Sequence, residues 1–138
     1  MNDDRVAKML ERTRAMRSAR DEVLRRVGVW LKEMGFQRAG AGHYTKDASN
    51  RIWHIGFQKM SSGYNVRVMC HVANEDGGDS VMGPWSDAYE CPNSPNGKKY
   101  MLCWNTGEAD IARCAQEYCR YIDEVVIAWF KQNSPRSE

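Results

Sequence analysis

The sequence lacks any long hydrophobic run. No stretch among its 138 residues approaches the roughly 20 consecutive apolar residues that a membrane-spanning helix requires. Residues 1–26 contain no uninterrupted apolar segment of the kind found in secretory signal peptides. The five cysteines are an odd number without a CxxC pair, which suits reduced thiols better than a disulfide framework. We therefore expect a cytoplasmic protein with no membrane contact.

The sequence also lacks the motifs of common enzyme classes. It contains no P-loop, no G-x-S-x-G and no HExxH, and its glycines at positions 40 and 42 do not have dinucleotide-binding spacing. Four cysteines lie in or near predicted core stripes, where thiols behave as small hydrophobic side chains. Cys91 is the one cysteine expected to be exposed, and a nucleophilic dyad with His71 would require the fold to bring the two together. From the sequence we therefore expect a protein that is not an enzyme, with no catalytic residue, no cofactor and no bound metal ion.

Net charge is small, and its distribution along the chain is uneven. The formal net charge of +2 does not by itself indicate nucleic-acid binding, and 42% hydrophobic with 28% charged residues is typical of a single soluble globular domain. Residues 74–97 contain no basic residue and five acids: Glu75, Asp76, Asp79, Asp87 and Glu90. A long acidic loop of this kind is either simply solvated or able to attract a basic partner.

An alternating pattern over residues 51–73 predicts a β-hairpin. Large apolar residues at every second position share one face when Ser62 and Gly63 form a two-residue turn. This register places Trp53 opposite Val72, Ile55 opposite Cys70 and Phe57 opposite Val68 on that face, and His54 opposite His71 and Gln58 opposite Arg67 on the other. A shift by one residue would mix polar and apolar side chains on both faces, so the unmixed register is the prediction.

A long N-terminal helix is predicted to precede the strands. Apolar residues at spacings of three, four and seven continue up to Gly35, which is expected at the position just after the helix end. The apolar stripe thins between Leu10 and Val23. We therefore expect the helix to pack on the sheet from about Ala19 onward, with residues 1–18 projecting.

The remaining pattern completes an α+β domain. It predicts a short first strand at 36–46, a long acidic loop at 74–97, a last strand at 98–105, a helix from Asn105 or Thr106 to about Gln132, and a loose tail at 133–138. This order of elements predicts a single domain with an antiparallel sheet of about four strands, on one face of which the N-terminal and C-terminal helices pack. The other face stays partly exposed to solvent.

The uncovered sheet face and the acidic loop hold the candidate site residues. Two histidines opposed on adjacent strands can share a metal ion, a proton or an anionic ligand, although a metal would require a further ligand. Aromatic residues in an otherwise polar loop are typical anchors of protein interfaces. The residues predicted to bind a partner are His54, Gln58, Arg67, His71, Asp76, Asp79, Trp85, Asp87 and Tyr89.

One set of residues follows a pattern shared with a known family. The pattern is a helix ending in Leu-x-x-x-Gly-Phe, a strand with an aromatic residue, a strand closing on a Gln-Lys-Ser type phrase, and a strand of alternating apolar residues. The matching positions are Leu31, Gly35, Phe36, Tyr44, Phe57, Gln58, Lys59, Val66 and Val68, with Trp104, Trp129 and Phe130 also similar. Over roughly residues 20–132 the chain thereby resembles the bacterial family called domain of unknown function 4304. The acidic loop and the extended first helix depart from that pattern.

These observations lead to three hypotheses. The resemblance implies no catalytic residues, and small bacterial α+β domains of this kind are often immunity or accessory proteins beside toxins. The first hypothesis is therefore a non-enzymatic protein-binding domain of the immunity type, which occludes a toxin with a basic surface through the open sheet face and the acidic loop. The second is a small enzyme or metal-binding protein that uses His54 and His71. The third and weaker one is nucleic-acid binding through the arginine-rich first helix.

Overall fold

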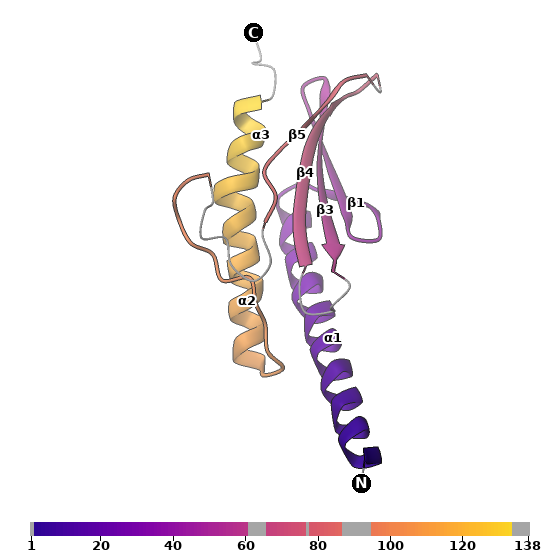
Figure 1. Cartoon of the computed structure of the whole chain (residues 1–138). Coiled ribbons are helices and arrows are strands. Elements are labelled where there is room, and N and C mark those ends of the chain that lie inside the picture. Colours follow the sequence, from indigo (N-terminus) through magenta and orange to yellow (C-terminus); the bar gives the residue numbers. More distant parts are fainter. Residues whose placement is uncertain (1, 61–65, 77, 87–94, 134–138) are drawn as a thin grey trace.

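The polypeptide forms one layer of helices packed on one layer of antiparallel strands (Figure 1). The computed structural model describes residues 2–60, 66–76, 78–86 and 95–133. Its elements are α1 (Asn2–Glu33), β1 (Gln37–Gly40), β2 (His43–Ala48), β3 (Arg51–Lys59), β4 (Val66–Asn74), β5 (Ser80–Met82), α2 (Glu108–Tyr121), η1 (Ile122–Ile127) and α3 (Ala128–Asn133). The predicted α+β fold is confirmed. Within the described residues, no helix combines the length and apolarity needed to cross a membrane.

The strands lie side by side in sequence order, β1-β2-β3-β4-β5, and each neighbouring pair is antiparallel. The predicted register of the central hairpin is confirmed: Trp53, Ile55 and Phe57 pair with Val72, Cys70 and Val68, His54 pairs with His71, and Gln58 pairs with Arg67. The apolar set faces the helices and joins the core. Because a shift by one residue would expose that whole set, burial of one face excludes such a shift. The expected turn at Ser62 and Gly63 lies outside the described residues.

The sheet has five strands rather than about four. The single strand predicted at 36–46 is two strands, because the chain turns back at Ala41 and Gly42, where Gly42 has a φ of 65°. Strand β5 forms inside the stretch expected to be a loop and pairs with β4. The strand predicted at 98–105 is wrong, since that segment is not part of the sheet.

Backbone groups of the segment at 98–105 form hydrogen bonds with side chains of helix α2. Tyr100, Leu102 and Trp104 alternate into the core as the pattern suggests. The backbone groups between them bond to side chains of α2: Glu117 accepts from the Met101 amide, Arg113 donates to the Met101 and Cys103 carbonyls, and Arg120 donates to the Lys99 carbonyl. These side chains supply the hydrogen bonds that a neighbouring strand would otherwise provide.

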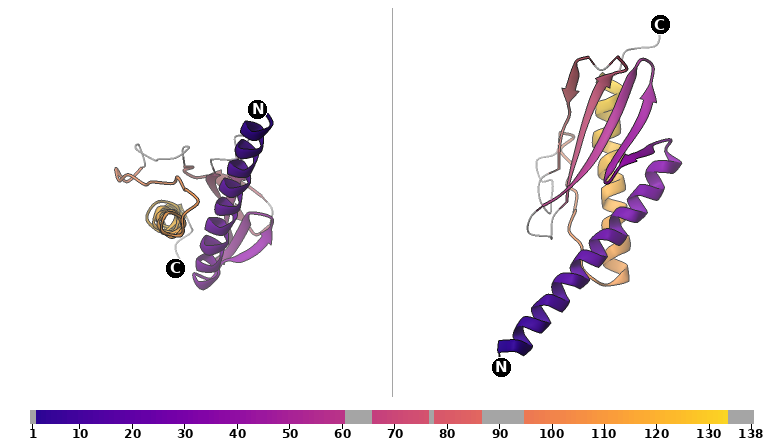
Figure 2. Two further views of the ribbon diagram at one scale, coloured as in Figure 1. Left: turned by 90° about the horizontal axis from the view of Figure 1, so that it is seen from below. Right: turned by 90° about the vertical axis from the view of Figure 1, so that its right-hand side faces the viewer.

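Helix α1 ends as predicted, where Gly35 adopts a left-handed φ of 94°. The Phe36 amide donates to the Leu31 carbonyl at 2.9 Å and the Gly35 amide donates to the Lys32 carbonyl at 3.0 Å, the two bonds of a Schellman motif. The buried positions of α1 begin at Ala19. The turns before it extend beyond the sheet (Figure 2).

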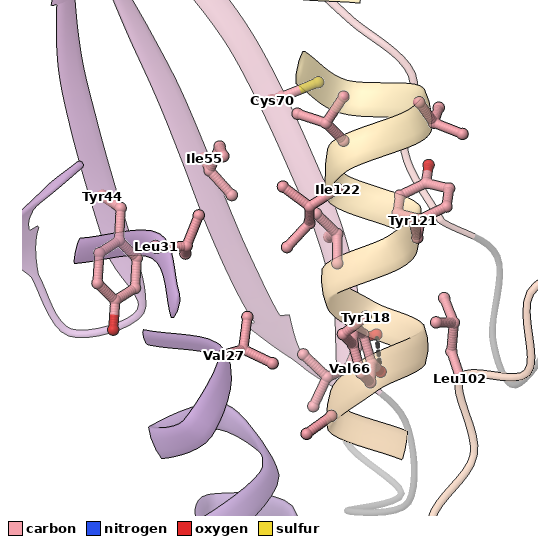
Figure 3. Packing of buried hydrophobic residues seen from close by; sticks show 14 of the residues in the cluster. Val27, Leu31, Tyr44, Ile55, Val66, Cys70, Leu102, Tyr118, Tyr121 and Ile122 are labelled. Carbon is pink, nitrogen blue, oxygen red and sulfur yellow. Dashed lines mark hydrogen bonds between the residues drawn. The ribbon is translucent and has the colours of Figure 1, made fainter. Parts of the chain in front are cut away.

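One continuous helical segment, α2-η1-α3, completes the core. It begins after Gly107 rather than after Asn105 or Thr106, and the cap makes no side-chain hydrogen bond. Its middle part, η1, is a π-helix with four buried side chains: Ile122, Val125, Val126 and Ile127. Figure 3 shows Tyr118 pointing from this segment toward β4, where its hydroxyl donates a 2.9 Å hydrogen bond to the Val66 carbonyl.

Candidate binding surface

Three histidines form a row across the uncovered face of the sheet. His43 lies on β2, His54 on β3 and His71 on β4, and all three are half-buried. His43 Nε2 lies 2.8 Å from His54 Nδ1, in a hydrogen bond whose donor depends on which nitrogen carries the proton. The His54 and His71 rings stack with centroids 4.1 Å apart and planes 8° apart. We call these three residues the histidine row.

Strand register explains why the histidine row forms. The β3–β4 register sets His54 opposite His71, as the sequence predicts. The β2–β3 register pairs His43 with Gly56, which lies two residues from His54 and therefore on the same face. The sequence analysis missed His43 because it assigned residues 36–46 to one strand. Polar residues at 43, 45 and 47 around the buried Tyr44 are the signal that could have placed it.

The environment of His54 and His71 disfavours their protonation. Burial lowers the pKa of His54, and the neighbouring His71 and His43 lower it further. Burial also lowers the pKa of His71, with a further contribution from His43. Arg67 lies on the same face of β4, and no described carboxylate within 4 Å forms an ion pair with a histidine of the row. These effects favour the neutral imidazoles of His54 and His71.

We expect the protein to lose stability as the pH falls below the ordinary range of histidine. The folded-state pKa values of His54 and His71 lie below those of the unfolded chain, so the unfolded chain binds protons first as the pH falls. The free energy of unfolding is therefore at its full value above about pH 6.5 and declines as the pH falls toward the lowered pKa values. Urea unfolding at about pH 7.5 and about pH 5.5 measures the decline, in a window above the titration of most carboxylates. His54→Phe keeps a flat ring in the row but cannot be protonated, so it should decline less. An equal decline in both proteins would contradict this account.

The other predicted residues of the sheet face lie where the register places them. Gln58 pairs with Arg67 four positions along from the histidine pair. Gln58 is exposed and Arg67 is half-buried, and Arg67 Nε has no hydrogen-bond partner among the described residues. At the edge of the sheet, Met82 pairs with His71 and is 58% exposed. The histidine row therefore continues into an apolar side chain that the sequence analysis did not include in the site.

Two of the predicted acids occupy the turn between β4 and β5. Asp76 and Asp79 are both exposed. Asp76 Oδ1 accepts a 2.8 Å hydrogen bond from the Gly78 amide, and the Asp79 carbonyl accepts a 3.3 Å bond from the Asn74 amide. In the described part of the chain neither carboxylate forms an ion pair. Their charge is available to a basic partner.

Trp85 lies in a segment that is anchored along the edge of β4. The Gly83 amide donates to the Cys70 carbonyl at 2.9 Å, and the Ser86 amide donates to the Val68 carbonyl at 3.0 Å. In return the Val68 amide donates to the buried Ser86 Oγ at 2.8 Å. Trp85 lies between these anchors and is 57% exposed. The backbone on both sides of the indole is fixed while the indole itself faces solvent.

The remaining candidates are residues of the acidic loop, the cysteines and possible metal ligands. Asp87, Tyr89 and Cys91 lie outside the described residues. Burial raises the pKa of Cys70 and Cys114 to about 12, so these thiols are poor nucleophiles. Across residues 2–60, 66–76, 78–86 and 95–133, no group of three or more His, Cys, Asp or Glu side chains is arranged to hold a metal ion.

The arginine-rich face of α1 is divided between ion pairs and solvent. The ion pairs are Arg20 with Asp21, Arg25 with Glu22, and Arg26 with both Glu22 and Glu108. Arg12, Arg14 and Arg17 are exposed and form no ion pair with a described residue. A phosphate backbone would have to compete with the chain's own carboxylates for half of this face.

Comparison with known proteins gives no further assignment. No family model matches the chain, and no curated protein or solved structure is significantly similar to it. The resemblance to the domain of unknown function 4304 family stays a prediction.

Proposed function

We propose that this chain is a non-enzymatic protein-binding domain of the immunity type, which neutralises a bacterial toxin by covering a basic surface on it. The observation that supports this proposal is an exposed Trp85 on an anchored backbone, close in sequence to exposed Val81 and Met82 and to the acids Asp76 and Asp79. Tryptophan and methionine are enriched in the centres of protein interfaces, and surrounding charges select the partner.

The edge of the sheet is shaped for such contacts. Strand β5 is three residues long and exposed throughout. Successive side chains of a strand point to opposite faces, so Val81 and Met82 make both sides of this edge apolar. Because hydrogen bonds to β4 already fix the segment that carries Trp85, binding would cost little backbone entropy. The described part of this edge therefore presents Trp85 on a backbone that is already fixed.

Reversing the acidic charge should weaken binding without unfolding the domain. The double variant Asp76→Lys with Asp79→Lys replaces two carboxylates by two cations at exposed positions. We expect affinity for the partner to fall by about tenfold or more at low salt, because attraction becomes repulsion. The partner is isolated on the tagged wild-type chain from the native host, and its affinity for both proteins is then measured by calorimetry.

The control reverses the same amount of charge elsewhere. Asp3→Lys with Asp4→Lys changes two exposed acids on the projecting part of α1. This variant should bind as the wild type does, and the thermal unfolding midpoints of both variants should stay near that of the wild type. If the Asp76 and Asp79 variant bound the partner with unchanged affinity, the acidic turn would not belong to the interface.

The histidine row supports a second candidate function, a small enzyme or metal-binding protein. His43 and His54 place two ring nitrogens 2.8 Å apart, and His71 stacks on the other side. Lowered pKa values favour the neutral imidazoles of His54 and His71, the form that can act as a base or as a metal ligand. The candidate is weaker because, among the described residues, no three His, Cys, Asp or Glu side chains are arranged to hold a metal ion. Metal analysis of the purified protein tests it directly.

A further inference from the structure

A groove runs between α1 and the strands β1, β2 and β3. Its volume is about 560 Å³, inside the range of about 300–1,000 Å³ that is usual for small-molecule sites. The helix contributes side chains from Asp21 to Lys32, which corresponds to about 16 Å of helix at 1.5 Å per residue. The strands contribute residues from Arg38 on β1 to Lys59 on β3. The groove therefore extends along the second half of α1.

The floor of the groove is apolar. Leu24 lies on the helix side, and the Tyr44 and Phe57 rings meet edge to face with centroids 6.0 Å apart. Opposite Tyr44 stands Gly28, where an added Cβ would collide with the tyrosine hydroxyl. Figure 3 shows the Tyr44 ring beside α1, with the hydroxyl toward the helix. Glycine is unfavourable inside a helix, and here it permits a close approach of helix and ring.

The rim of the groove is strongly cationic. Four basic residues line it, Arg25, Lys32, Arg38 and Lys59, against the single carboxylate of Asp21. Glu22 pairs with Arg25 at 2.6 Å, and Asp21 lies 3.5 Å from Lys59. Lys32 and Arg38 are exposed and have no carboxylate within 4 Å in the described part of the chain. Arg38 Nε donates to the Gly40 carbonyl at 3.2 Å, which does not neutralise its charge, so both cations can attract an anion.

We propose that this groove binds a small amphiphilic carboxylate. The apolar part of the ligand would lie beside Tyr44 and cover the partly exposed Leu24 and Phe57, while its carboxylate would accept charge-assisted hydrogen bonds from Lys32 and Arg38. The groove lies on the helix-covered side of the sheet, away from the histidine row. The proposal is therefore independent of the protein-binding function, and either can fail without the other.

Octanoate is the probe, titrated into the full chain by calorimetry. We expect saturable binding of one octanoate per chain. Octan-1-ol lacks the charge and inorganic phosphate lacks the apolar chain, so each should bind at least about tenfold more weakly. Lys32→Gln with Arg38→Gln should weaken octanoate binding by about tenfold or more. Val29→Trp should abolish it, because Val29 lines the groove and is 46% exposed, so a larger side chain there fills the groove without disturbing the core.

Two matched variants serve as controls on the projecting part of α1. Lys8→Gln with Arg12→Gln removes the same charge, and Val6→Trp adds the same side chain at a position that is 52% exposed. Both should bind octanoate as the wild type does, with amide chemical-shift changes centred on Gly28 and Phe57. No saturable binding to the wild type, or unchanged binding to either groove variant, would overturn the proposal.

Discussion

Replacing Phe130 with alanine should lower the free energy of unfolding by about 3–5 kcal/mol. The Phe130 ring is fully buried and stacks on Trp53 with centroids 4.8 Å apart and planes 9° apart, and Phe36 lies 6.5 Å away. These rings join α3, β3 and the chain that leaves α1. Because these rings belong to three different elements, they cannot move together to fill the cavity that alanine leaves. Urea denaturation with linear extrapolation measures the loss.

That loss is large compared with the total stability of a domain this size, which is about 5–15 kcal/mol. Leu10→Ala is the matched control, because Leu10 is exposed on the projecting part of α1. It should change the free energy of unfolding by less than about 0.5 kcal/mol. A loss below about 1 kcal/mol for Phe130→Ala would show that the aromatic contact does not hold the helix on the sheet.

The central hairpin could be predicted from the sequence because two local constraints determine it. Alternation excludes a shift by one residue, which would move Trp53, Ile55 and Phe57 off the face of their apolar partners, and a two-residue turn expected at 62–63 selects the register that is observed. The end of α1 was predictable for a similar local reason, since Gly35 supplies a left-handed φ that other residues rarely adopt. Both are decided by residues close in sequence.

The wrongly predicted and missed strands have a different cause. Here the structure depends on residues that are distant in the sequence. The alternation at Tyr100, Leu102 and Trp104 correctly reports burial, but Arg113, Glu117 and Arg120 of α2 satisfy the backbone that a strand would have paired. Alternation of apolar residues does not indicate which groups form hydrogen bonds with the backbone amides and carbonyls. Strand β5 was missed because it is three exposed residues with no buried face.

The candidate surface was predictable in part for the same reasons. The pairing of His54 with His71 followed from the hairpin register alone. The place of His43 depends on a second register, β2 with β3, which the single predicted strand at 36–46 concealed. The anchoring of Trp85 depends on Ser86, whose hydrogen bonds reach β4 eighteen residues away. No local pattern in the acidic stretch indicates that bond.

Replacing Trp85 with alanine should weaken partner affinity by about thirtyfold or more, which is about 2 kcal/mol. The indole is 57% exposed in the free chain and its backbone is already fixed, so a partner that buries it gains area at little entropic cost. For the same reason, the free energy of unfolding should change by less than about 0.5 kcal/mol. Calorimetry with the isolated partner measures the first quantity, and urea denaturation measures the second.

The kinetics of binding separate the role of Trp85 from that of the acids. Loss of a buried aromatic anchor acts mainly on the dissociation rate, whereas charge reversal at Asp76 and Asp79 acts mainly on the association rate and on its salt dependence. Trp85→Ala should therefore dissociate faster at every salt concentration, while Leu10→Ala, another exposed apolar residue, should behave as the wild type. If Trp85→Ala dissociated at the wild-type rate, the indole would lie outside the interface, and the acidic turn would have to provide binding by charge alone.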